Sequence, residues 1–247
     1  MASLIGSYSL GFGLFFSVFI IFFSVRNLRD TEILDKKIVS FTFIQFFLVV
    51  ISFFGLIISF INSDFSNETV FNHSHTTKPL FYKISGTWGN HEGSLLLWLL
   101  VLTLFISIFL FKSNHQPKKY RIFTLLFQQI IIIGFFIFLI KTSSPFNYIF
   151  PTPNEGLGLN PILQDPALAI HPPILYLGYA SLEPLGIGDI LAALFLGTLH
   201  SLGIFLSSIN QQKLVLYLGT MPLIVVELYL FINSLLSKVL FVDVIGI

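Results

Sequence analysis

Long apolar runs separated by polar segments make up most of this 247-residue chain. Four runs come close to the roughly 20 apolar residues that a helix needs to cross a bilayer, at residues 7–25, 39–61, 94–111 and 122–140. The apolar material after residue 170 predicts two more spans, at 190–209 and 214–236. The pattern therefore predicts an all-α fold, a polytopic integral membrane bundle of about six transmembrane helices.

The apolar stretch 172–209 allows two interpretations. It is too long for one span, and Glu183, Pro184 and Asp189 interrupt it. Two spans would carry Lys213 to the opposite side from the other short basic loops, whereas one span at 190–209, preceded by a broken or interfacial piece, keeps it with them. We favour one span.

Lysine and arginine are concentrated in the two short loops, 26–37 and 112–121. These loops hold eight basic residues, whereas the two long polar loops, 62–93 and 141–170, hold three. Because basic loops stay on the cytoplasmic or matrix side, we expect the amino terminus and both long loops to face the periplasm or intermembrane space. Within the first long loop, residues 62–77 are expected to be solvated and mobile.

The composition argues against several classes of function. Hydrophobic residues make up 55% of the chain and charged residues 10%, with a net charge of +1, so no basic surface favours nucleic acid. The absence of cysteine excludes disulfides and thiolate chemistry within this chain. No basic segment precedes the first apolar run and no small-residue cleavage site follows it, so we expect a retained span.

A polar cluster opens the third span, W-G-N-H-E-G-S at 88–94. Trp88 offers an aromatic face, and His91 offers a nitrogen that can bind metal or move protons. Glu92 would orient His91 or carry charge, and the glycines allow a close backbone approach. An aromatic belt at the membrane interface would explain Trp98 alone, but not the accompanying histidine and carboxylate. The cluster therefore indicates a functional site.

A second cluster, L-Q-D-P-A-L-A-I-H-P-P at 163–173, carries His171. The two following prolines stiffen the backbone and disfavour a helical conformation at His171. A rigid, non-helical histidine at the membrane surface suits a haem or metal ligand, with Asp165 and Gln164 close enough in sequence to support it. An ordinary surface histidine before a proline-started helix accounts for the residues equally well.

The remaining ionisable groups are weaker candidates. His73 and His75 form a pair that could bind a transition metal, although such a pair more often lies in a solvated loop without a metal. His200 lies inside an apolar segment, where a histidine needs a partner. In the last third, Glu183, Asp189 and Glu227 would serve as a proton relay, or would lie at span ends or at a subunit interface. No nucleotide-binding or catalytic-triad motif occurs.

Two long segments carry a specific resemblance. K-I-S-G-T-W-G-N-H-E-G-S-L-L-L-W at 83–98 and N-P-I-L-Q-D-P-A-L-A-I-H-P-P-I-L-Y-L-G-Y at 160–179 resemble, in order and spacing, two blocks of the CcmF-type cytochrome c haem lyase family of System I cytochrome c maturation. The resemblance covers residues 1–180 and fades after residue 179. It implies a CcmF-like amino-terminal membrane domain at 1–180 and a divergent hydrophobic segment at 181–247.

The resemblance also implies a cofactor and partners. The family attaches haem to the thiols of a C-x-x-C-H motif in apocytochrome c, with haem delivered by the chaperone CcmE and the apoprotein presented by CcmH-type proteins. His171 matches the first of two external histidines that hold haem, so the resemblance implies that it is an axial ligand to haem iron. Trp88, His91, Glu92 and Asp165 are then expected to line or support the pocket. No catalytic residue is assigned in this chain.

The chain departs from the family pattern at several points. It has two tryptophans and lacks the W-G-G-W-W-x-W-D segment, the second external histidine and the transmembrane histidines that hold haem b. His200 matches none of these motifs. The departures imply the amino-terminal portion of a split CcmF, as in mitochondrial CcmFN, with haem b shared with a carboxy-terminal half on another chain. We expect this chain alone to be inactive.

Three functions remain in competition. The first is a haem lyase subunit in the mitochondrial inner membrane, or alternatively in a bacterial inner membrane. The second is a haem-transport or scaffold protein of the same complex without chemistry of its own. The third is a proton-coupled transporter that uses Glu183, Asp189 and Glu227.

Overall fold

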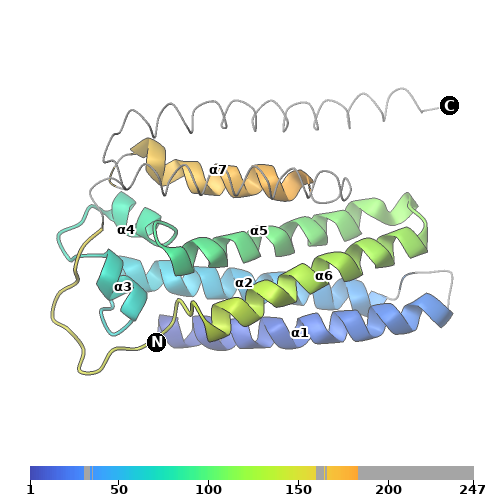
Figure 1. Ribbon diagram of the computed structural model, residues 1–247, viewed down its shortest axis with the longest axis horizontal. Coiled ribbons are helices and arrows are strands. Elements are labelled where there is room, and N and C mark those ends of the chain that lie inside the picture. The colour runs from blue at the N-terminus through green and yellow to red at the C-terminus, as the bar shows by residue number, and fades with distance from the viewer. Residues whose placement is uncertain (31–33, 35, 160–163, 165, 183–247) are drawn as a thin grey trace. The chain divides into compact units, whose positions relative to one another are not determined.

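Four long helices form the body of the protein in the computed structural model (Figure 1). The structure describes residues 1–30, 34, 36–159, 164 and 166–182. The long helices are α1 (Ala2–Asp30), α2 (Lys36–Ile61), α5 (His91–Lys112) and α6 (Lys118–Lys141), and each is long and apolar enough to cross a membrane. They confirm the first four predicted spans and the all-α class. The two spans predicted after residue 170 lie outside the described residues.

The chain forms two compact units, Met1–Pro173 and Ile174–Ile247, and the second is described only through Leu182. In the first unit α1 packs on α2 and α6, and α5 packs on the same two helices. Consecutive long helices run in opposite directions (Figure 1). The seams between them are filled by apolar side chains with no exposed surface: Ile20, Leu56, Leu99 and Ile132. The outward faces are also apolar, which suits helices surrounded by lipid.

A polar contact joins three of the helices inside the bundle. Gln45 of α2 and Gln129 of α6 exchange side-chain hydrogen bonds of 3.2 and 2.9 Å, and Gln45 also donates to the Ser17 hydroxyl of α1. All three side chains are fully buried. Because lipid offers no hydrogen-bond partners, such amides must be satisfied within the protein, and here they join α1, α2 and α6.

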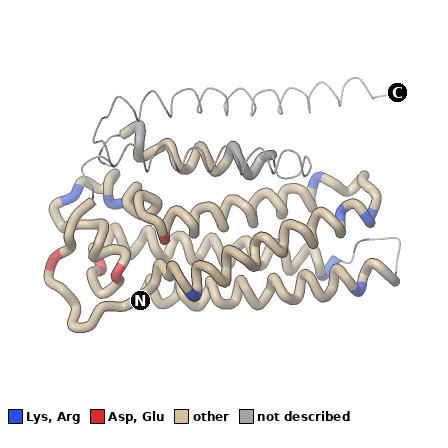
Figure 2. The backbone as a smooth tube through the Cα atoms, in the orientation of Figure 1, with Lys and Arg blue, Asp and Glu red and all other residues tan. Residues whose placement is uncertain are grey.

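The two ends of the bundle differ in charge. The eight basic residues of the segments 26–37 and 112–121 lie in the ends of α1, α2, α5 and α6, and these helix ends lie together at one end of the bundle (Figure 2). The segments 62–90 and 142–159 lie at the other end, where the positions of Asp and Glu coloured in Figure 2 are found. The separation of short basic loops from long polar loops predicted from the sequence is therefore present in the fold.

The first long segment is folded, and the prediction of a mobile, solvated loop at 62–77 is wrong. It contains α3 (Glu68–His73), and α4 (Leu80–Gly86) follows it. Asn67 is fully buried: its side chain accepts from the Val70 amide at 3.1 Å and donates to Ser3 Oγ at 2.6 Å and to the Pro145 carbonyl at 2.9 Å. The polar side chain of Asn67, which the sequence suggested would face water, therefore forms its hydrogen bonds with other groups of the protein.

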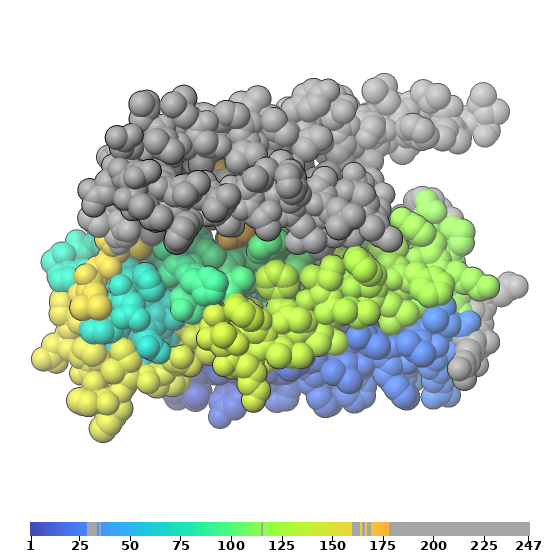
Figure 3. All heavy atoms as spheres, in the orientation of Figure 1, coloured from blue at the N-terminus to red at the C-terminus, as the bar shows by residue number. Residues whose placement is uncertain are grey.

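The second long segment lies against the first. Backbone hydrogen bonds join Glu68 to Asn147 at 2.9 Å, Ile149 to Ser66 at 2.9 Å and Leu157 to Phe71 at 2.8 Å. The two segments form a continuous surface at this end of the first unit, cyan and yellow in Figure 3. We call this structure, residues 62–90 and 142–159, the cap. It includes the first residues of the W-G-N-H-E-G-S cluster, Trp88 to Asn90.

The helix α7 (Pro166–Leu182) contains His171, so the prediction that His171 is non-helical is wrong. Pro166 opens the helix, where a missing amide costs nothing. Pro172 and Pro173 lie inside it, and each removes one hydrogen bond from the helical ladder. A proline disfavours the helical conformation only of the residue that precedes it. At His171 the rest of the helix outweighs this local preference.

Candidate functional site

The W-G-N-H-E-G-S motif forms a tight turn into α5. Asn90 is the N-cap: its side-chain oxygen accepts from the Gly93 amide at 2.7 Å, and its side-chain nitrogen donates to the Gly86 and Thr87 carbonyls at 2.7 and 3.1 Å. At Gly93 a Cβ would lie only 1.6 Å from the Thr87 oxygen, so no larger residue fits. Much of the motif thus serves to build one rigid turn.

Trp88 is held at the start of this turn and reaches a distant helix. Its carbonyl accepts from Ser94 Oγ at 2.6 Å, and its ring stacks on Phe53 of α2 with centroids 6.4 Å apart and an interplanar angle of 19°. Its indole nitrogen donates to the Ala169 carbonyl of α7 at 2.7 Å. The two clusters singled out in the sequence are therefore joined directly, across 81 residues.

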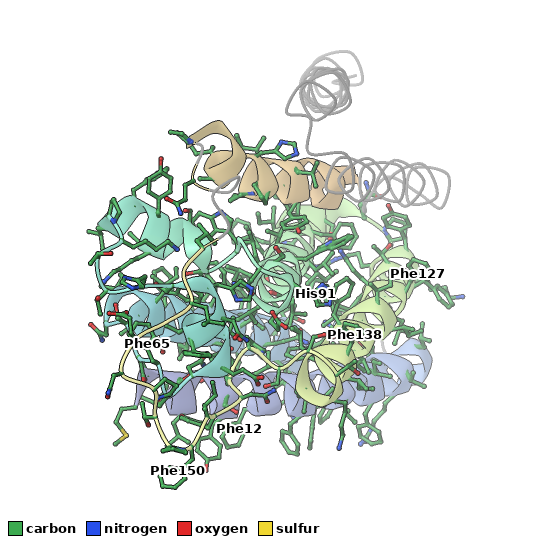
Figure 4. The ribbon with its side chains drawn as sticks, turned by 60° about the vertical axis from the view of Figure 1, so that its left-hand side comes forward. Phe12, Phe65, His91, Phe127, Phe138 and Phe150 are labelled. Atoms are coloured by element: carbon green, nitrogen blue, oxygen red, sulfur yellow. The ribbon has the colours of Figure 1, made fainter. Side chains whose placement is uncertain are left out.

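The side chains of His91 and Glu92 have different neighbours from the side chain of Trp88. The His91 ring is exposed and meets Phe138 of α6 edge-on, with centroids 6.2 Å apart (Figure 4). Glu92 is half-buried in the first turn of α5, where the positive end of the helix dipole favours a carboxylate. The structure shows no hydrogen bond from Glu92 to His91, so the expected orienting contact is not formed.

His171 is half-buried, on a helix whose neighbouring apolar positions are open. Ile170 and Ile174, one turn apart on α7, are 50% and 55% exposed. Asp165, expected to support His171, lies outside the described residues, whereas Gln164 donates to the Leu159 carbonyl at 3.1 Å. His171 thus lies next to an exposed apolar side chain on this helix, that of Ile170.

The cap histidines do not form a metal site. His73 Nδ1 is 3.0 Å from the Thr69 carbonyl, whereas His75 Nδ1 is 2.9 Å from Thr77 Oγ1 and its Nε2 is 3.8 Å from Glu155. Among the described residues no group of three or more His, Cys, Asp or Glu side chains could hold a metal ion. A metal held at His171 would need further ligands from elsewhere.

Two lysines of the cap, Lys78 and Lys83, lie close enough for their charges to interact. Lys78 is half-buried, donates to the His73 carbonyl at 2.9 Å, and has its pKa lowered to about 8 by desolvation and by the nearby charge of Lys83. Lys83 donates to Ser63 Oγ at 2.7 Å. Hydrogen bonds from Thr76, together with His75, lower the pKa of Glu155. Sequence reasoning did not single out Lys78, because spacing alone gave no sign of its burial.

Comparison with known proteins is consistent with these features. The family described as "Cytochrome C assembly protein" matches residues 88–237, which begin at Trp88 and include α7. CycK of Rhizobium meliloti (strain 1021), a "Cytochrome c-type biogenesis protein", is 48% identical over 134 residues, covering 54% of this chain and 20% of CycK. CcmF of Escherichia coli (strain K12), of the same description, is 38% identical over 165 residues, covering 65% of this chain and 25% of CcmF.

A solved structure, "Cytochrome c Heme Lyase CcmF", superposes with a TM-score of 0.61 at 25% identity, covering 74% of this chain and 29% of that chain. The chain thus spans about a fifth to a quarter of the length of the curated relatives it matches. The family match covers more than half of the 247 residues and continues beyond residue 179, where the resemblance seen in the sequence fades. The chain belongs to the cytochrome c assembly protein family, as a CcmF-type cytochrome c biogenesis protein.

Proposed function

We propose that the chain is a subunit of a cytochrome c haem lyase complex and takes part in covalent attachment of haem to apocytochrome c. The observation that carries the proposal is the direct bond between the two clusters, in which the Trp88 indole N–H donates to the Ala169 carbonyl, two residues before His171. The names of the relatives support the pathway, because they are cytochrome c-type biogenesis proteins.

His171 is proposed as an axial ligand to haem iron. A half-buried imidazole next to the exposed side chain of Ile170 suits a flat apolar cofactor, because an imidazole nitrogen would bind the iron and an aliphatic side chain would cover part of the ring. Haem, when bound, supplies the vinyl groups to which cysteine thiols add. Among the described residues no group of three or more His, Cys, Asp or Glu side chains could hold a metal ion, and the opposing ligand is proposed to come from the partner chain.

The partners and location follow from the same proposal. The chain would pair with a carboxy-terminal CcmF half, and the complex would contact a CcmH-type protein, the haem chaperone CcmE and apocytochrome c. The basic end of the bundle supports an orientation with the cap and the amino terminus facing the intermembrane space, or the periplasm. The membrane would be the mitochondrial inner membrane or, alternatively, a bacterial inner membrane.

Mild affinity purification of the full chain from its native membrane tests the proposal. We expect a CcmF-related partner to co-purify with a six-coordinate haem spectrum. His171→Ala should remove that spectrum and cytochrome c maturation, whereas the control His75→Ala, which changes an exposed cap histidine, should remove neither. The chain purified without partners should not hold haem stably. A complete six-coordinate spectrum from the isolated chain, unchanged by His171→Ala, would refute the assignment.

A scaffold or haem-transport role without chemistry of its own is the second candidate. It predicts that His171→Ala leaves maturation intact, whereas disruption of the cap abolishes it. The transporter hypothesis rests on Glu183, Asp189 and Glu227, which lie outside the described residues. It would be supported only if changing those carboxylates, and not His171, stopped maturation.

A further inference from the structure

Pro173 leaves a backbone carbonyl of α7 without its usual partner. In an α-helix the carbonyl of residue 169 accepts from the amide of residue 173. Residue 173 is proline, which has no amide hydrogen. An unsatisfied carbonyl in a dry environment is costly, and Ala169 is only 5% exposed. The helix therefore needs a donor from outside itself at this carbonyl.

Trp88 supplies that donor. Its indole N–H reaches the Ala169 oxygen at 2.7 Å, a normal hydrogen-bond distance, and it is the only polar atom that a tryptophan side chain carries. An interfacial tryptophan would turn this group towards water and headgroups. The bond instead pairs the indole N–H with the Ala169 carbonyl, which Pro173 leaves without a helical donor.

Trp88 is itself fixed against the bundle. Its ring lies on Phe53 of α2, and its carbonyl is held by Ser94 of α5. The turn that carries it is closed by Asn90 and leaves no room for a side chain at Gly93. A bond from so rigid a turn sets the position of the α7 backbone two residues before His171.

We propose that Trp88 is a positioning residue: its indole N–H replaces the helical bond lost at Pro173 and so fixes the first turns of α7, and with them His171, on the end of the bundle. That His171 is the residue to be positioned rests on the proposed function. On this assignment Trp88 acts through α7 and not as part of the aromatic wall of a haem pocket, since one ring face is taken by Phe53.

The absence of native cysteine allows a direct test with the full chain in membranes. A single cysteine at Ala169→Cys, 5% exposed in the native residue, should react slowly with maleimide, whereas Ile170→Cys, 50% exposed, should react quickly and serve as the control. Trp88→Phe keeps an aromatic ring but removes the N–H. It should speed labelling at position 169 by about tenfold, as expected for loss of one hydrogen bond to a buried acceptor.

A second substitution makes the test specific. Pro173→Ala restores a backbone amide that can bond Ala169, so it should return labelling of the Trp88→Phe chain to the native rate. Pro172→Ala is the matched control: it restores the amide one position earlier, which faces residue 168, and should not rescue. Unchanged labelling in Trp88→Phe, or equal rescue by both alanines, would overturn the inference. The second result would point to general stiffening of the helix.

Haem spectra of the partner complex separate this inference from the proposed function. Trp88→Phe should shift the absorption of the His171-ligated haem and lower cytochrome c maturation, and Pro173→Ala should restore both. If the labelling pattern holds but His171→Ala leaves spectrum and maturation unchanged, the bond stands and the positioning of a haem ligand is refuted. If His171→Ala abolishes the spectrum while Trp88→Phe changes neither labelling nor spectrum, the proposed function stands and the role of Trp88 is refuted.

Discussion

Gly93→Ala is expected to destabilise the protein strongly, because the new methyl group has no space. A Cβ at this position would lie 1.6 Å from the Thr87 carbonyl oxygen and 2.8 Å from the carbonyl carbon. Real Cβ atoms keep at least 3.0 Å, so the turn must open by about 1.4 Å (3.0 − 1.6). The obstacle is backbone, which cannot swing aside as a flexible side chain does.

The energetic cost has two parts. Overpacking a tight site costs roughly 1–3 kcal/mol. Opening the turn also breaks the Asn90 cap, whose oxygen is 2.7 Å from the Gly93 amide, at a cost of about 1 kcal/mol. We therefore expect a loss of about 2–4 kcal/mol in the free energy of unfolding.

Gly134→Ala provides the matched control. Gly134 lies in α6 and no atom lies within 4 Å of a Cβ built there. Alanine should stabilise this helix by up to about 1 kcal/mol, because glycine is the poorer helix former. Both variants would be compared by thermal and denaturant unfolding in detergent, followed by helical circular dichroism. Equal stability of the two variants would refute the packing argument for the W-G-N-H-E-G-S turn.

Two further predictions concern the bundle and the cap. Gln45→Leu should lower the free energy of unfolding by about 1–2 kcal/mol in the same assay, because it leaves the buried amide of Gln129 unpaired. Adding Gln129→Leu should recover much of this loss. Additive losses from the two substitutions would contradict the pairing. The pKa of Lys78 is lowered to about 8, so the unfolded chain binds more protons between pH 8 and its ordinary value of 10.5, and stability should rise across that window. Lys78→Met should flatten the rise in the free energy of unfolding measured from pH 7 to pH 11, and an unchanged slope would argue against the burial of Lys78.

The spans could be predicted from the sequence because lipid leaves little choice. A run such as 39–61 must be a helix in a bilayer, and α2 (Lys36–Ile61) agrees to within three residues. The separation of basic from polar loops followed as well, because two spans lie between the two basic loops and return the chain to the same end, whereas one span lies between a basic loop and the next polar loop. Both results rest on hydropathy and length, which are local properties.

The cap and the site were harder to predict, because their contacts are not local. Asn67 is polar and lies in a polar segment, yet it is buried by bonds to Ser3 and Pro145, 64 and 78 residues away in sequence. His171 was expected outside a helix because two prolines follow it. The helix persists there because a donor from Trp88 replaces one of the missing amides, and no local rule predicts such a partner.

The glutamine pair has a consequence for how the protein is made. Helices enter the membrane in the order of synthesis, so α1 and α2 are in place before α6. At that stage the Gln45 amide nitrogen already has Ser17, but its oxygen lacks the bond that Gln129 supplies. Until α6 arrives, the α1–α2 hairpin exposes an unmet acceptor to lipid. The insertion of α6 therefore completes the hydrogen bonding of a group that α1 and α2 alone leave unsatisfied.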